Sequence, residues 1–308
     1  MLKYNVDLDY AIPLVDISKE ELNEIIAKAD KIISEGKENP KELAVAYLKK
    51  AQCLYKIEQS DIFASEDDLL LPPTENSGRF IITIDDKQEQ KEIKGLLEKA
   101  LELSPEMPEA LMRLGSTYGN NTTDKDKIDA AIDLLTRAIQ LKPDYAAAFN
   151  NRSSEIHKLG GEDNINKAIA DLSEAIRIRP FDAMYYYNRA GCYSDLEMHE
   201  KVIEDLSNVL NYSSDAFKKI NRIFLKRGKK YMELEEYGKA ADDFSESLNL
   251  EMDHANTLLM RGKAYYLAGE KDKAKADIEE YLKRKRKSAY DAGRKEIYKH
   301  IGVMPEDI

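Results

Sequence analysis

Apolar and small residues recur along the chain at spacings that predict pairs of helices. The first helix of each pair carries an aromatic residue or Leu, a small residue four places later and usually Tyr three places after that. Spacings of three and four place these side chains on one helical face. Five copies follow one another: Leu111/Gly115/Tyr118, Phe149/Ser153/Ile156, Tyr186/Ala190/Tyr193, Phe224/Gly228/Tyr231 and Leu258/Gly262/Tyr265.

The second helix of each pair carries a small residue followed by an apolar residue four places later. The pairs are Ala131/Leu135, Ala168/Leu172, Val202/Leu206, Ala240/Phe244 and Ala274/Ile278, and the steps between them are 37, 34, 38 and 34 residues. A proline, which cannot continue a helix, closes several second helices at Pro105, Pro143 and Pro180. The chain is therefore predicted to be an array of helical hairpins.

This pattern resembles the tetratricopeptide repeat, a helix–turn–helix unit with a period of about 34 residues. The resemblance covers roughly residues 87–287, although the family's Trp is missing and Ser214 and Met252 replace the closing Pro. It implies an all-α, right-handed α-solenoid of about six units with N- and C-terminal capping helices, because end repeats need covers for their apolar faces.

The predicted boundaries follow from the repeat. They are an N-terminal segment with its capping helix at 1–40; a degenerate unit at 41–105 with a long insertion at 58–86; five units within 106–287, at 108–143, 146–180, 183–214, 221–252 and 255–287; and a C-terminal capping helix and tail at 288–308. The insertion contains Leu69–Leu71 and a β-branched stretch around Phe80–Ile82. It is read either as a contact element or as a flexible insert.

Composition narrows the class of protein. Among 308 residues there are 47 Lys and Arg and 58 Asp and Glu, a net charge of −11, so broad affinity for nucleic acid is disfavoured and a protein or peptide partner is expected. No apolar run is long enough to span a membrane. Cys53 and Cys192 are the only cysteines, and the first residues carry acids where an export signal needs an apolar run. A cytoplasmic location is therefore predicted.

Motifs for catalysis or cofactors are missing from the sequence. It shows no phosphate-binding loop, dinucleotide fingerprint or nucleophile elbow, and its four histidines stand in no zinc or triad spacing. The acidic run Asp124–Asp129 lacks the glycine and closing Glu of a calcium loop. The basic run Lys283–Lys287 is read as the end of a helix more readily than as a nucleic-acid site. We predict no enzyme, no metal and no cofactor.

The resemblance also implies a binding surface. In this family the first helices line a concave groove, so the groove residues are predicted to be Asn150, Asn151, Ser154, Tyr187, Asn188, Arg222, Lys226, Lys229, Lys263 and Tyr266. The C-terminal part of this set is basic. The predicted function is a scaffold or adaptor that holds an extended, acidic peptide segment of a partner, with a structural subunit contacting partners through its ends and the 58–86 insertion as the alternative.

The stretch Tyr186–Ala190 also resembles the family members whose carboxylate clamp binds an acidic C-terminal tail. Asn188 matches the clamp asparagine, and Arg222 and Lys226 fall where the next repeat supplies cations. Asn150 and Ser154 stand where the clamp has Lys and Asn, so the match is half complete.

Overall fold

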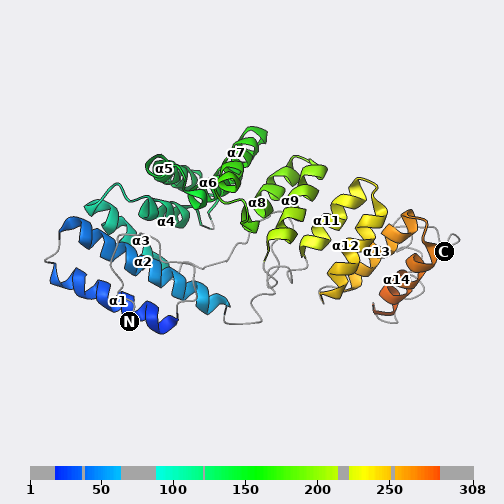
Figure 1. Ribbon diagram of the computed structural model, residues 1–308, viewed down its shortest axis with the longest axis horizontal. Coiled ribbons are helices and arrows are strands. Elements are labelled where there is room, and N and C mark those ends of the chain that lie inside the picture. Colours follow the sequence, from blue (N-terminus) through cyan, green and yellow to red (C-terminus); the bar gives the residue numbers. More distant parts are fainter. Residues whose placement is uncertain are drawn as a thin grey trace. The chain divides into compact units, whose positions relative to one another are not determined.

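The computed structural model describes residues 18–36, 39–63, 88–120, 122–213, 222–250 and 254–284 (Figure 1). All regular secondary structure within these ranges is α-helical, which confirms the all-α prediction of stacked hairpins. The chain divides into two compact units, Met1–Pro180 (unit 1) and Phe181–Ile308 (unit 2). Each unit is described by itself below.

Unit 1 contains seven described helices, in which α2/α3, α4/α5 and α6/α7 form hairpins and α1 packs on α2. The helices are α1 (Lys19–Glu35), α2 (Pro40–Phe63), α3 (Gln88–Leu103), α4 (Pro108–Gly119), α5 (Lys125–Leu141), α6 (Ala146–Lys158) and α7 (Glu162–Ile178).

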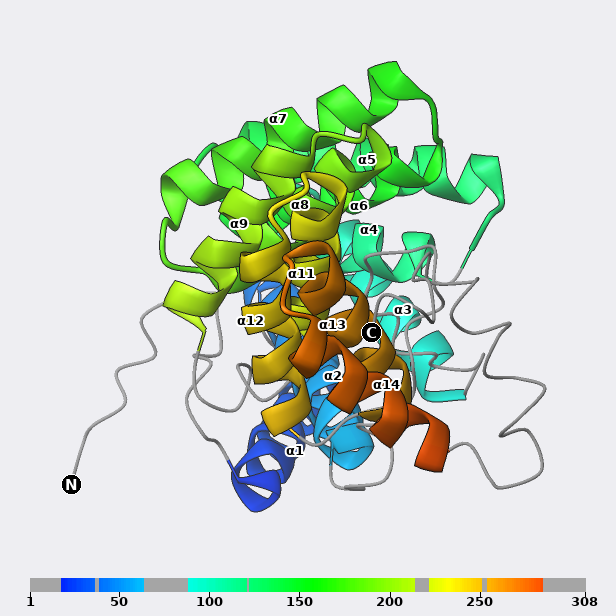
Figure 2. The same ribbon diagram turned by 90° about the vertical axis from the view of Figure 1, so that its right-hand side faces the viewer.

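Unit 2 contains three hairpins among its described residues, each packed on the next (Figures 1 and 2). The helices are α8 (Ala183–Asp195), α9 (His199–Tyr212), α11 (Arg222–Glu233), α12 (Tyr237–Asn249), α13 (His254–Leu267) and α14 (Lys271–Arg284).

The first helix, α1, is bounded by well-formed caps. The Ser18 hydroxyl accepts a hydrogen bond from the backbone N–H of Glu21, whose carboxylate accepts one from the N–H of Ser18. Gly36 ends the helix with φ 57°, a left-handed conformation that glycine adopts without a steric penalty. The apolar face of α1 buries Leu22 and Ala29, and Asp30 forms an ion pair with Lys50 of α2 at 2.8 Å.

Close contact between the two helices of a hairpin depends on the small residue of the first helix. A Cβ added at Gly228 would lie 2.8 Å from a ring carbon of Phe244, and one added at Gly115 would lie 2.9 Å from Cγ of Leu135. Phe244 and Leu135 are both fully buried. The predicted small and apolar positions therefore meet each other across the hairpin, where packing is tightest.

The turn inside each hairpin of unit 2 uses a left-handed residue at the same place. Glu197 has φ 54°, Glu235 has φ 61° and Gly269 has φ 84°. The residue after each of them donates its N–H to the carbonyl of the tyrosine five residues before it, as Glu236 does to Tyr231 at 2.9 Å. Two of these three turns thus hold a non-glycine residue where glycine is favoured.

The predicted insertion and C-terminal cap lie mostly beyond the described ranges. Helix α2 continues to Phe63, so the first six residues of the predicted 58–86 insertion are helical. The stretches Leu69–Leu71 and Phe80–Ile82 and the predicted capping helix at 288–308 lie outside the described residues. Of the basic run at 283–287, Lys283 and Arg284 form the end of α14.

Candidate functional site

Successive first helices touch one another through their side chains in both units. In unit 1, α2 meets α4 through Tyr55 and Arg113, and α4 meets α6 through Ser116 and Asn151. In unit 2, α8 meets α11 through Tyr187 and Lys226. We call the side of each unit that is formed by its first helices, α2, α4 and α6 in unit 1 and α8, α11 and α13 in unit 2, its first-helix face.

Tyr187 and Lys226 are the two predicted groove residues that make the closest contact in unit 2. The ammonium Nζ of Lys226 donates a hydrogen bond to Tyr187 Oη at 2.7 Å and lies 4.5 Å from the centre of its ring. Tyr187 is only 7% exposed, so its ring and hydroxyl serve as a support beneath the lysine. The position of Lys226 is thereby fixed without a carboxylate.

The other predicted cations of unit 2 lie on the same helices. Lys229 is exposed on α11, and Lys263 is half-buried on α13. Neither has an ion pair with a described residue. Arg222 is the first residue of α11, and its side chain lies outside what the structure describes.

The two remaining predicted residues of unit 2 differ in their surroundings. Asn188 is half-buried on α8, next to Tyr187. Tyr266 packs against the hydrophobic cluster of Leu258, Ile278 and Tyr281, so part of its ring belongs to the core of the last hairpin.

The predicted residues of unit 1 form a small hydrogen-bonded group on α6. Asn151 Nδ2 donates to Ser116 Oγ at 2.7 Å, and its Oδ1 accepts from Asn150 Nδ2 at 3.2 Å. Ser154 Oγ donates to the backbone carbonyl of Asn150 one turn earlier, at 3.2 Å. The structure thus brings Asn150, Asn151 and Ser154 together in unit 1.

Four buried ion pairs were missed at the sequence level. In each pair an Arg just before the small residue of the first helix forms two hydrogen bonds of 2.7–2.9 Å with an Asp just before the buried apolar residue of the second helix. The pairs are Arg152–Asp171, Arg189–Asp205, Arg227–Asp243 and Arg261–Asp277. The recurrence of Arg and Asp at these positions was the signal that could have identified them.

Three of these arginines also reach the hairpin before their own. Arg152 donates to Thr136 Oγ1 at 3.1 Å, Arg227 to Ser207 Oγ at 2.9 Å and Arg261 to Ser245 Oγ at 3.1 Å. A planar guanidinium with several fixed donors suits this double role.

Burial and hydrogen bonding shift pKa values in two of these pairs, Arg189–Asp205 and Arg227–Asp243. Burial raises the pKa of Asp205, although its hydrogen bonds from Arg189 act in the opposite direction. The hydrogen bond from Arg227 to Asp243 raises the pKa of that guanidinium. The Arg227 guanidinium therefore stays charged, and Asp243 balances its charge inside the hairpin.

Charge is divided unequally between the helices of unit 2. The first helices α8, α11 and α13 contain eight Lys and Arg and two Asp and Glu, whereas the second helices α9, α12 and α14 contain seven and ten. Of the eight cations, the three arginines of the buried pairs are neutralised by the second helices, and Lys230 pairs with Glu233 at 2.8 Å. The side chain of Arg222 lies outside the described residues, and Lys226, Lys229 and Lys263 remain as cations without a carboxylate in contact among the described residues.

The described residues also bear on metal binding and membrane insertion. The part of the chain that the structure describes has no group of three or more His, Cys, Asp or Glu side chains that could hold a metal ion. None of the described helices is both long and apolar enough to cross a membrane. Cys53 and Cys192 are free thiols, and both are buried.

Comparison with known proteins identifies one repeat and the fold. Residues 255–288 match the family model described as tetratricopeptide repeat. The solved structure described as PilF of Pseudomonas aeruginosa is 16% identical, with a TM-score of 0.55 over 83% of this chain and 99% of that one. No curated protein matches the sequence.

Two further structures are similar at lower scores. YrrB, titled a TPR protein with an unusual peptide-binding site, is 18% identical, with a TM-score of 0.49 over 75% of this chain and 95% of that one. MamA is 17% identical, with a TM-score of 0.49 over 59% of this chain and 95% of that one. Residues 255–288 thus match a tetratricopeptide repeat, and the chain shares the fold of PilF.

Proposed function

We propose that the protein is a non-catalytic scaffold that holds an extended, acidic segment of a partner protein on the first-helix face of unit 2. The segment's carboxylates would meet Lys226, Lys229 and Lys263, with Arg222 adding a fourth cation at the start of α11. A reducing, cytoplasmic location belongs to the same proposal, and the two free, buried thiols are compatible with it.

One observation carries this proposal. Arg189, Arg227 and Arg261 are matched by aspartates of their own hairpins, but Lys226, Lys229 and Lys263 have no carboxylate in contact among the described residues. In a protein of net charge −11, this leaves positive charge on the first helices of two consecutive hairpins, α11/α12 and α13/α14. Carboxylates from another chain are the complementary group.

The contact between Lys226 and Tyr187 supports the same conclusion. Because Tyr187 fixes the ammonium group, less side-chain entropy is lost when a carboxylate binds. The remaining donors of the ammonium group can form charge-assisted hydrogen bonds with a ligand. Asn188, beside Tyr187, supplies an amide that could bind the backbone of an extended peptide.

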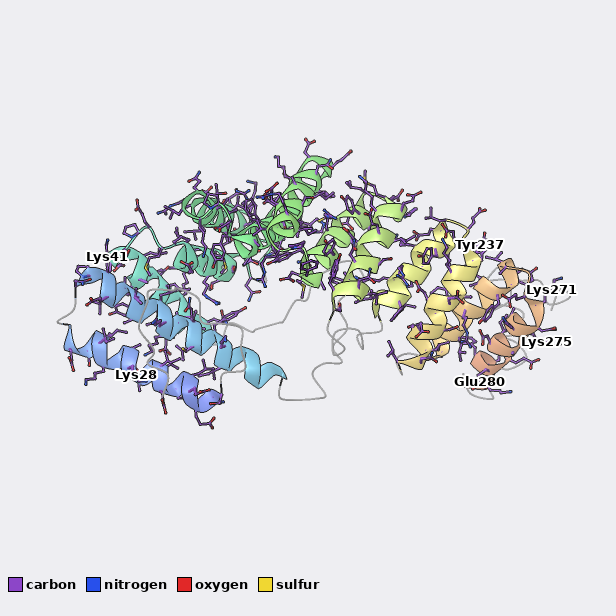
Figure 3. All side chains as sticks on the ribbon, in the orientation of Figure 1. Lys28, Lys41, Tyr237, Lys271, Lys275 and Glu280 are labelled. Atoms are coloured by element: carbon purple, nitrogen blue, oxygen red, sulfur yellow. The ribbon has the colours of Figure 1, made fainter. Side chains whose placement is uncertain are left out.

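The experiment measures binding of a fluorescent peptide of about eight Asp and Glu residues to the full chain by anisotropy. The test variant is Lys226→Gln with Lys263→Gln. The control is Lys271→Gln with Lys275→Gln, which removes the same charge from exposed lysines on α14, the second helix of the last hairpin (Figure 3).

Each exposed ion pair contributes roughly 0.5–1 kcal/mol, so the test variant should bind about 5- to 30-fold more weakly at low salt. The control should bind within about twofold of wild type, and binding by both should fall as salt rises. Equal weakening in test and control variants would mean that only the overall charge matters, and the assignment to the first-helix face would be wrong.

A further inference from the structure

Arg113 of α4 occupies the same place in its hairpin as Lys226 does in unit 2. Each stands two residues before the small residue of a first helix, Gly115 in one case and Gly228 in the other. Each also lies over a tyrosine of the preceding first helix: the Arg113 guanidinium is 5.2 Å from the Tyr55 ring, and Lys226 Nζ is 4.5 Å from the Tyr187 ring. The two units therefore repeat one arrangement of a cation on an aromatic ring.

Arg113 differs from the arginines of the buried pairs because no carboxylate contacts it among the described residues. Its Nε is buried and makes no hydrogen bond. Glu109, the acid one turn before it on α4, is held instead by Lys142, the residue that follows α5, at 3.1 Å, and the second oxygen of Glu109 is buried without a hydrogen bond.

Further positive charge lies beside Arg113 on α2. Lys49 and Lys56 are seven residues apart and so share one side of that helix. Both lysines and Arg113 act on the Cys53 thiol, where their charges oppose the rise in pKa that burial causes. The three cations thus surround one part of unit 1.

The nearby acids of α1 and α3 are engaged by other cations. Asp30 and Glu92 both pair with Lys50, at 2.8 and 3.5 Å, and Glu98 lies 3.8 Å from Lys94. Lys49 has no ion pair with a described residue. Positive charge therefore remains on the first-helix face where α2 and α4 meet.

We infer that this surface, formed by Arg113, Lys49 and Tyr55, is a second binding position for an acidic peptide segment. The inference rests on the proposed function and extends it, because each unit then carries its own position for carboxylates. Tyr55, which is 38% exposed, offers an aromatic surface beside the cation for the apolar part of such a segment. A partner with two acidic stretches would bind the full chain more tightly than a partner with one.

The test uses the full chain and the same acidic peptide carrying a photo-crosslinker, with crosslinked sites mapped by mass spectrometry. Crosslinks to both α2/α4 and α8/α11 are expected. Arg113→Gln should reduce crosslinking at α2/α4 by about fivefold or more and leave crosslinking at α8/α11 unchanged. Lys226→Gln should reduce crosslinking at α8/α11 and leave crosslinking at α2/α4 unchanged. Arg177→Gln, on the second helix α7 where Arg177 pairs with Glu174, is the matched control and should change neither.

Arg113→Lys keeps the charge and should retain most of the α2/α4 crosslinks, whereas a purely structural role would not distinguish Lys from Gln. Circular dichroism confirms that each variant is folded. Crosslinks confined to α8/α11 in the wild type would overturn this inference and leave the proposed function intact. Crosslinks to α2/α4 that persist in Arg113→Gln would show that Arg113 does not hold the peptide and would overturn this inference. A wild-type protein without crosslinks at either place would refute both proposals.

Discussion

Leu114 and Leu134 occupy in the α4/α5 hairpin the two positions that Arg227 and Asp243 occupy in the α11/α12 hairpin. Each leucine stands just before the small or apolar residue that marks its helix, Gly115 or Leu135. Leu114 belongs to the core cluster of unit 1, and Leu134 packs against that cluster. One array thus uses a buried ion pair and an apolar pair at equivalent places.

This equivalence predicts that the Arg227–Asp243 pair can be replaced as a pair. Arg227→Leu with Asp243→Leu should leave the free energy of unfolding within about 1 kcal/mol of wild type or raise it, because two desolvated charges are exchanged for apolar packing. Asp243→Leu alone should lower it by about 3 kcal/mol, since the guanidinium loses its partner. Urea denaturation of the three proteins measures both effects, and a double variant less stable than the single one would contradict the argument.

The fit of Gly228 against Phe244 predicts a size-dependent clash. Gly228→Ala should destabilise the protein by about 1–3 kcal/mol because the new methyl group would meet the buried ring. Adding Phe244→Leu should recover part of this loss, since Ala190 and Leu206 stand at the same two positions of the α8/α9 hairpin. A double-mutant cycle by chemical denaturation measures the coupling, which should be absent if the two sites act independently.

The left-handed turn at Glu235 predicts a stabilising substitution. Glu235→Gly should raise the free energy of unfolding by about 0.5–1 kcal/mol, because glycine adopts φ 61° without the steric cost of a side chain. Gly269→Ala, at the equivalent turn of the last hairpin, should have the opposite sign. Thermal melts of both variants check the prediction, and a destabilised Glu235→Gly would reveal a side-chain role at this turn.

Burial raises the pKa of the Cys53 thiol to about 11. The native thiol should therefore remain protonated at pH 8 and react slowly with iodoacetamide, while unfolding in urea should make it reactive. Labelling followed by mass spectrometry, with and without urea, measures the difference.

The same shift gives the sign of a pH effect on stability. Because the folded-state pKa lies above the value of 9.0 expected for an exposed thiol, the stabilising contribution is complete below about pH 9 and is lost as pH rises toward about 11. Cys53→Ala removes this contribution, so the wild type should lose about 2–3 kcal/mol more than the variant over that interval. Parallel loss of stability in both proteins would contradict the assignment.

The fold could be predicted because the repeat fixes side chains that determine packing. Gly115, Gly228 and Gly262 face Leu135, Phe244 and Ile278, as the spacing of small and apolar residues predicted. The ion pairs escaped prediction because pairing depends on where two helices meet, and Arg189 and Asp205 are sixteen residues apart in sequence. Glu197 and Glu235 gave no turn signal, since neither is a residue type that favours a left-handed conformation.

For the candidate site, sequence indicated the helices more reliably than the role of each side chain. Tyr187 is a predicted groove residue, and the structure adds that it is 7% exposed and accepts a hydrogen bond from Lys226. Arg113 was not among the predicted residues, because only the structure shows that Tyr55 lies beneath it and that Glu109 turns to Lys142. The predicted groove residues themselves remain predictions.

The hydroxyl contacts of Arg152, Arg227 and Arg261 have a consequence for how such an array can change length. The α11/α12 hairpin contributes both Arg227, which reaches backward to Ser207, and Ser245, which accepts a hydrogen bond from Arg261 of the next hairpin. This hairpin therefore carries matching contacts at both of its ends. Gene duplication or deletion in steps of one hairpin would preserve the junctions, whereas a cut through the middle of a hairpin would destroy two at once.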